Sequence, residues 1–244
     1  MSSLSAALTS SIGKKFVMGI TGLFLCLFLL IHLAGNGLLF VGNSAYNEYA
    51  HKLHSMPAFL VTSEILLYFA IAVHLYLAFK TSGLNWSARG DVEYSTKKTK
   101  IYNRVLGIQP ESMMFFSGFI VLVFMLIHVL DFKFEVGWGQ VEKMEPFDKA
   151  MVILGDTWRK LIYVVGSLFV GLHVVHGLRS AFQSLGFNHP KYNQGLRYLS
   201  IGFAIIVAVG FASFPLWFTS AKPVTVEATP DGTVMTEPSA SPQP

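Results

Sequence analysis

Long apolar stretches alternate with short polar stretches along most of this 244-residue chain. Five of the apolar stretches are long enough, at about 1.5 Å per helical residue, to cross about 30 Å of hydrocarbon. They are residues 16–41, 58–79, 112–130, 160–185 and 196–218. A cleaved signal peptide would have a shorter apolar run than the first stretch, followed by a small-residue cleavage site. The pattern predicts an all-α membrane protein with five transmembrane helices, and we find no internal repeat.

The composition supports this prediction, since 52% of the residues are hydrophobic and only 13% are charged. A soluble domain carries about 25% charged residues. The formal net charge of +4 does not indicate nucleic-acid binding, because the basic residues lie in short groups between the apolar stretches instead of forming one basic surface. Basic groups between apolar stretches set the orientation of a chain in a membrane. We therefore expect the chain to be surrounded by lipid and not to bind nucleic acid.

The distribution of lysine and arginine predicts the orientation. Residues 80–110 carry six basic and two acidic residues, whereas Lys52 is the only basic residue between the first two spans. Residues 131–160 carry five basic and six acidic residues and therefore give the weakest indication of the orientation. We expect the 80–110 connection and the N-terminus to be cytoplasmic and the C-terminus to lie outside. Further basic residues on the cytoplasmic side would be Lys14, Lys15, Arg179, Lys191 and Arg197.

The end of the chain differs from the rest. From Lys222 onward it is rich in Pro, Ser and Thr and has no apolar run. Such a segment cannot bury enough apolar surface to fold. We therefore expect a membrane domain over residues 1–221 and a disordered tail on the outer side over residues 222–244.

The single cysteine, Cys26, lies inside the first apolar stretch. One cysteine excludes a disulfide framework, an iron–sulfur site held by several thiolates and a C-x-x-C-H covalent haem site. Any redox cofactor must therefore be held by histidine.

Five of the eight histidines fall inside predicted spans. Their depths follow from the predicted orientation, at about 1.5 Å per residue. His32 and His128 lie toward the outer face, on the first and third helices. His74 and His173 lie toward the inner face, on the second and fourth helices. The fifth, His176, is three residues from His173 and shares its helix face.

Two histidine pairs at two depths are what two bis-histidine haems require, since each iron takes one imidazole from either side of a flat macrocycle. A zinc site would need three or four ligands at one depth. A proton relay would use carboxylates, and apart from Glu64 the spans hold almost none. Histidines that merely bond neighbouring helices are the remaining alternative. We expect four of the helices to form a bundle that binds two b haems.

With these histidines the chain resembles the cytochrome b subunit of the succinate dehydrogenase and fumarate reductase family, in its five-helix, dihaem, single-polypeptide form. Four segments carry the resemblance, and it extends over residues 10–218. The segments are SSIGKKFVMGITGLFLCLFLLIHLAGN at 10–36, AVHLYLAF at 72–79, FMLIHV at 124–129 and HVVHGLRSAFQSLG at 173–186.

The resemblance implies how the histidines are used. In the family the first and third helices bind the distal haem, which implies His32 and His128, and the second and fourth bind the proximal haem. The fourth helix of the family reads His-x-x-x-Gly, which His173 and Gly177 match. His173 is thus the expected iron ligand, and His176 is expected beside the haem, near a propionate. Arg179 is a further candidate for a propionate partner, because a guanidinium binds a carboxylate with two hydrogen bonds.

The resemblance also implies partners and a location. A flavoprotein with covalent FAD and an iron–sulfur protein would dock on the cytoplasmic side of a bacterial cytoplasmic membrane. This chain would have no succinate-oxidising activity alone, and would pass electrons from the iron–sulfur subunit through two b haems to menaquinone or another quinone. Some quinol-oxidising members have a glutamate two residues before the fourth ligand. Gly171 stands there in this chain, which favours succinate oxidation over fumarate reduction.

A quinone site needs a polar group beside an apolar slot near the outer haem. The candidates there are Glu64, His54 and Glu48, with His51 expected to be a solvated loop residue. Glu64 is the preferred candidate, since an unpaired carboxylate in hydrocarbon is costly, and the alternative is that it bonds a neighbouring helix. The competing functions are the cytochrome b of another quinone-linked dehydrogenase, such as a hydrogenase, formate dehydrogenase or nitrate reductase, a quinol:fumarate reductase, and a transporter or assembly protein with structural histidines.

Overall fold

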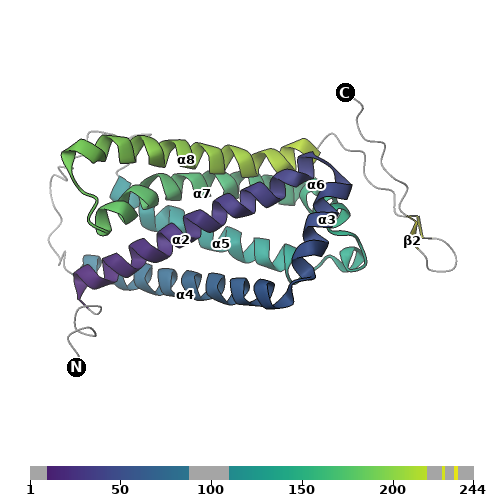
Figure 1. The fold of residues 1–244 in the computed structure, drawn as a ribbon, viewed down its shortest axis with the longest axis horizontal. Helices are drawn as coiled ribbons and strands as arrows, with labels where there is room; N and C mark the ends of the chain where they lie inside the picture. The colour runs from purple at the N-terminus through teal and green to yellow at the C-terminus, as the bar shows by residue number, and fades with distance from the viewer. Residues whose placement is uncertain (1–9, 88–109, 219–226, 229–233, 236–244) are drawn as a thin grey trace.

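Five long apolar helices form the body of the molecule in the computed structural model, which describes residues 10–87, 110–218, 227–228 and 234–235 (Figure 1). The helices long and apolar enough to cross a membrane are Ser11–Phe40, Pro57–Gly83, Met114–Phe132, Thr157–Ser184 and Pro190–Trp217. They match the five predicted spans, so the prediction of an all-α, multi-pass membrane protein is confirmed. Many large side chains on these helices are exposed, for example Phe69 and Leu126, as expected of surfaces that face lipid.

The described residues form seven α-helices in chain order. They are α2 (Ser11–Gly37), α3 (Asn43–His54), α4 (Pro57–Ser87), α5 (Pro110–Phe132), α6 (Pro146–Gly155), α7 (Thr157–Ser184) and α8 (Pro190–Trp217), with 3-10 turns at Leu38–Phe40 and Gly139–Val141. In the predicted tail the structure describes only a two-residue antiparallel pair, β1 (Glu227–Ala228) with β2 (Val234–Met235). The remainder of 222–244 and most of the 80–110 connection lie outside the described residues.

Local signals explain where the helices begin. The Ser10 hydroxyl accepts a hydrogen bond from the Gly13 amide at the start of α2, and the Asp156 carboxylate accepts from two amides at the start of α7. Proline occupies the first turn of α6 and of α8, where its missing amide proton costs nothing. The caps therefore set the entry points of the helices, and the apolar runs set their lengths.

Two short helices, α3 and α6, lie outside the predicted spans, because neither contains an apolar stretch of hydrocarbon length. Helix α3 follows α2, and α6 precedes α7, so both lie at the same end of the bundle (Figure 1). They contact each other: the Phe147 amide donates to the Asn47 side-chain oxygen at 2.8 Å, and His51 pairs with Glu145 at 2.7 Å. His51 is therefore exposed but helical, and the prediction that it lies in a loop is wrong.

Helices α7 and α8 pack closely at Gly171. A Cβ at Gly171 would lie 2.7 Å from Ala208 Cβ and 3.0 Å from the Ala204 carbonyl oxygen. Contacts below 3.0 Å force something to move, so only glycine lets α8 approach this closely. Position 171 thus faces α8, which gives its glycine a packing reason independent of any proton path.

Candidate functional site

The structure brings His32 of α2 and His128 of α5 together. Their ring centroids are 5.7 Å apart and the ring planes lie at 81°. An imidazole nitrogen binds a metal at about 2.0–2.1 Å, so two rings on opposite sides of one metal ion have centroids about 6 Å apart. The spacing of this outer pair is therefore close to the spacing of two imidazoles that bind one metal ion.

The outer pair is surrounded by aromatic rings. The neighbours are Phe28 and Phe211 for His32, and Phe124, Phe132 and Tyr163 for His128, with centroids 5.2–6.2 Å away. Flat apolar side chains of this kind exclude water and pack well against a macrocycle.

His74 of α4 and His173 of α7 are the histidines of the expected second, inner pair. Each ring lies against a glycine of a neighbouring helix. A Cβ at Gly22 would lie 3.5 Å from His74 Cε1, and a Cβ at Gly118 would lie 3.1 Å from His173 Cε1. These glycines make room for the imidazoles between the helices.

A hydroxyl group holds each inner ring. Thr21 Oγ1 lies 3.2 Å from His74 Nδ1, and Ser117 Oγ lies 3.3 Å from His173 Nδ1. Histidines that bind metals use their second nitrogen in such a bond, which fixes the orientation of the ring. Sequence reasoning did not identify either hydroxyl.

The two pairs lie at two levels of the bundle. Gly22, which contacts His74, is ten residues before His32 on α2, and Gly118, which contacts His173, is ten residues before His128 on α5. Ten helical residues rise about 15 Å. The arrangement thus places one pair above the other, each made from two helices.

The same ten-residue spacing reveals a repeat that we did not recognise in the sequence. The pattern Met-x-x-(Ser/Thr)-Gly-x9-His occurs at residues 18–32 and again at residues 114–128. Helices α2, α3 and α4 are followed by α5, α6 and α7 in the same order of long, short and long. The absence of an internal repeat was therefore a wrong prediction, and a comparison of the two spans aligned on their histidines would have revealed it.

Arg179 lies six residues beyond His173, about 9 Å along α7. Its Nε atom is buried and has no hydrogen-bond partner among the described residues. A buried donor of this kind is costly unless an acceptor satisfies it. An anionic group such as a haem propionate would do so. His176 lies three residues after His173, on the same side of α7.

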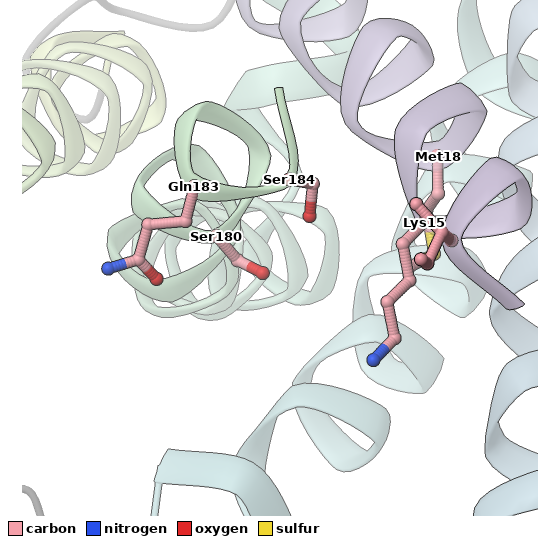
Figure 2. A pocket seen from close by; sticks show the side chains of 6 residues that line it. Lys15, Met18, Ser180, Gln183 and Ser184 are labelled. Atoms are coloured by element: carbon pink, nitrogen blue, oxygen red, sulfur yellow. The ribbon is translucent and has the colours of Figure 1, made fainter. Parts of the chain in front are cut away.

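A hollow of about 410 Å³ opens near this end of the bundle, between α2 and α7 (Figure 2). The residues that line it are Ile12, Lys15 and Met18 on α2 and Ser180, Gln183 and Ser184 on α7. The hydroxyl and amide groups of Ser180, Gln183 and Ser184 follow Arg179 along the C-terminal end of α7, and Lys15 faces them from α2. They make this end of the bundle polar and partly cationic.

Asp131 forms a second polar cluster that sequence reasoning missed. Its carboxylate is fully buried and accepts hydrogen bonds from Trp138 Nε1, Arg159 Nε and the Tyr163 hydroxyl at 3.0–3.1 Å. Tyr163 in turn packs against His128. Asp131 lies three residues after His128, so helical spacing alone could have placed it beside the outer pair.

The quinone candidates lie on two helices, Glu48 and His54 on α3 and Glu64 on α4. Glu64 pairs with Lys133 of the α5–α6 connection at 2.5 Å, which agrees with the alternative that its carboxylate bonds a neighbouring element. Glu48 and His54 are exposed, and His54 Nδ1 donates to the Ala50 carbonyl oxygen.

Within the described ranges, no group of three or more His, Cys, Asp and Glu side chains is placed to hold a metal ion. No protein-family model, curated protein or solved structure matches the chain.

Proposed function

We propose that this chain is the membrane-anchor cytochrome b subunit of a succinate:quinone oxidoreductase. It would pass electrons from an iron–sulfur subunit through two b haems to menaquinone or another quinone. The observation that supports this most directly is the arrangement of His32 with His128 and of His74 with His173 at two levels about 15 Å apart. Resemblance to the succinate dehydrogenase and fumarate reductase family, based on the four segments quoted above, gives the proposal its partners and substrate.

The residues present fit two haems. His32 and His128 would hold the outer haem, and His74 and His173 would hold the inner haem. Each bound haem would supply one-electron redox chemistry at its iron. Gly22 and Gly118 leave space for the inner ligands, and the unpaired Nε of Arg179 could bind an inner propionate.

The remaining residues would control the surroundings of the haems. The aromatic neighbours of the outer pair would keep water away from it, and the buried Asp131 would hold Tyr163 against His128. Glu64 lies ten residues, or about 15 Å, from His74 along α4. This rise equals the separation of the two pairs, so Glu64 would lie at the level of a quinone beside the outer pair.

The proposal assigns an orientation and a location. The inner pair faces the cytoplasm of a bacterial cell, and the N-terminus lies on the same side, as the basic residues indicate. The flavoprotein and the iron–sulfur protein dock there. The polar hollow between α2 and α7 lies on this side of the bundle, where the iron–sulfur partner would be close to the inner pair.

The test is a reduced-minus-oxidised absorption spectrum of the purified chain with its copurified partners. Two bis-histidine haems give strong Soret and alpha bands, and succinate should reduce them when an FAD subunit is present. A spectrum without haem bands would support a transporter or assembly protein instead. Haem bands with a molybdenum or nickel subunit in place of the FAD subunit would support another quinone-linked dehydrogenase.

A further inference from the structure

The inner histidines share a feature that the outer histidines lack in the structure. Each inner ring places Nδ1 beside the hydroxyl of the residue that precedes a helix glycine: Thr21 before Gly22, and Ser117 before Gly118. The two contacts come from different helices, yet their lengths agree within 0.1 Å. Around the outer pair the described ring neighbours are aromatic, and Asn36 is the polar group near His32.

The direction of these hydrogen bonds follows from the hydroxyl groups. A hydroxyl has one hydrogen to donate and two lone pairs. Thr21 Oγ1 lies 3.1 Å from the carbonyl oxygens of Val17 and Met18, and Ser117 Oγ lies 3.2 Å from that of Met114. A carbonyl oxygen only accepts, so each hydroxyl donates to its own helix. Its lone pairs are then left to accept from a ring N–H.

The main-chain acceptors are equivalent at the two sites. The Met18 carbonyl oxygen accepts from Thr21, and the Met114 carbonyl oxygen accepts from Ser117. Each inner ring thus meets a hydroxyl that donates to the carbonyl three residues earlier on its own helix. Such a hydroxyl accepts from the imidazole nitrogen beside it, so that nitrogen carries the proton.

We propose that Thr21 and Ser117 are positioning residues, which hold His74 and His173 with the proton on Nδ1 so that Nε2 of each ring is free to bind the inner haem iron. The inference rests on the proposed function and adds to it the residues that set the ligands. An acceptor at Nδ1–H makes Nε2 more basic and fixes the plane of the ring. A more basic ligand stabilises ferric iron more than ferrous iron.

The test is a redox titration of the purified complex, followed at the alpha band. The inner component is the one that is lost in His74→Ala. Thr21→Val and Ser117→Ala should each raise its midpoint potential. We expect the ferric-to-ferrous ratio at a fixed potential to fall by up to about tenfold, or about 59 mV for one electron. The low-spin electron paramagnetic resonance signal of the same component should shift as the ring plane relaxes, and the outer component should not change.

Two kinds of control separate positioning from packing. Thr21→Ser and Ser117→Thr keep the hydroxyl and should keep the wild-type potential. Ser200→Ala is the second control. The Ser200 hydroxyl is as buried as that of Ser117 and also donates to a carbonyl of its own helix. It lies on α8, which carries neither histidine pair. This variant should leave both components unchanged.

The outcomes distinguish the inference from the proposed function. A wild-type chain without haem contradicts the proposed function. A wild-type chain with two haems, whose inner potential stays constant or falls in Thr21→Val and Ser117→Ala, overturns the inference alone. The inference is also overturned if Thr21→Ser behaves as Thr21→Val, because the methyl group would then be responsible. Loss of only the inner haem in Thr21→Val, with retention in Thr21→Ser, supports it.

Discussion

Single glycines decide how closely the inner histidines approach the neighbouring helices. A Cβ at Gly118 would lie 3.1 Å from His173, tighter than most real contacts, whereas a Cβ at Gly22 would lie 3.5 Å from His74, an ordinary contact. The two sites are otherwise alike, since each glycine follows a hydroxyl residue that bonds the same ring. They therefore form a matched pair for mutation.

We predict that Gly118→Ala lowers the occupancy of the inner haem and that Gly22→Ala has a smaller effect. The added methyl group on α5 must push the His173 ring by a few tenths of an ångström, and the one on α2 need not move His74. Haem content per chain, with the two components resolved in the alpha band, measures the difference. Equal losses, or a greater loss in Gly22→Ala, would show that these contacts do not limit the site.

At the scale of residues, the sequence indicated four histidines as candidate ligands but did not indicate which side chains contact them. Histidine in an apolar span is rare enough to be noticed, and its depth follows from counting. Serine and threonine are common in spans, so Thr21 and Ser117 carry no such signal until the register of two helices is known. The partner of Glu64 could not be identified from the sequence for the same reason, because Lys133 is 69 residues away.

Among the elements, the short helices and the Asp131 cluster organise the end of the bundle that holds the outer pair. Trp138 and Arg159 come from the segments before and after α6, and both donate to the buried Asp131 of α5. Tyr163 of α7 donates to the same carboxylate and packs on His128. This cluster joins the α5–α7 connection to the outer histidine.

We predict that Asp131→Ala destabilises the protein by about 3–5 kcal/mol, as removal of one partner of a buried ion pair does. Unfolding followed in mild detergent measures this loss. The outer haem should be disturbed more than the inner haem, because Tyr163 loses its hydrogen bond beside His128.

The matched control is Glu64→Gln, which breaks the partly exposed pair with Lys133. A pair of this kind contributes about 1 kcal/mol or less. If Asp131→Ala were no more destabilising than Glu64→Gln, the buried cluster would not hold this end of the bundle together.

The long helices were predictable because hydrocarbon thickness sets their length, and the short ones were not. Helix α3 reads NSAYNEYAHKLH, with no apolar run, and α6 is only ten residues long. Pro146 before the run AMVIL was the available signal for α6. The contact between α3 and α6 depends on the tertiary arrangement of α2, α4, α5 and α7, which no local pattern specifies.

For the whole molecule, the orientation in the membrane is a prediction that one pair of labels can test. Cys26 is the only cysteine, so a Cys26→Ala chain can carry single new cysteines. Ser44→Cys, on exposed α3, should react with a membrane-impermeant maleimide in intact cells. Asn188→Cys, exposed before α8, should react only after the membrane is opened. The reverse pattern would invert the orientation and place the outer pair on the cytoplasmic side.

Electron flow across the molecule should respond to the membrane potential. An electron that enters at the inner pair and leaves at a quinone beside the outer pair crosses most of the bilayer. Each charge moved fully across gains or costs about 2.3 kcal/mol per 100 mV. With an inside-negative potential the outward direction is downhill, so we predict that an uncoupler slows succinate-to-quinone activity in intact cells.

The detergent-solubilised complex is the control, because no potential exists there and its rate should not depend on the uncoupler. An unchanged or faster rate in cells after collapse of the potential would contradict the placement of the quinone. The quinone would then lie near the inner pair, or a proton path would compensate the charge.

The central claim is that His32 and His128 hold one haem while His74 and His173 hold another. The most direct measurement is the haem content and alpha-band spectrum of four single variants in which each histidine is replaced by alanine. His32→Ala and His128→Ala should lose the same spectral component, His74→Ala and His173→Ala should lose the other, and His176→Ala should keep both. The account would be contradicted if a variant from the first pair and a variant from the second pair lost the same spectral component. Loss of a haem in His176→Ala, with retention in His173→Ala, would also contradict it.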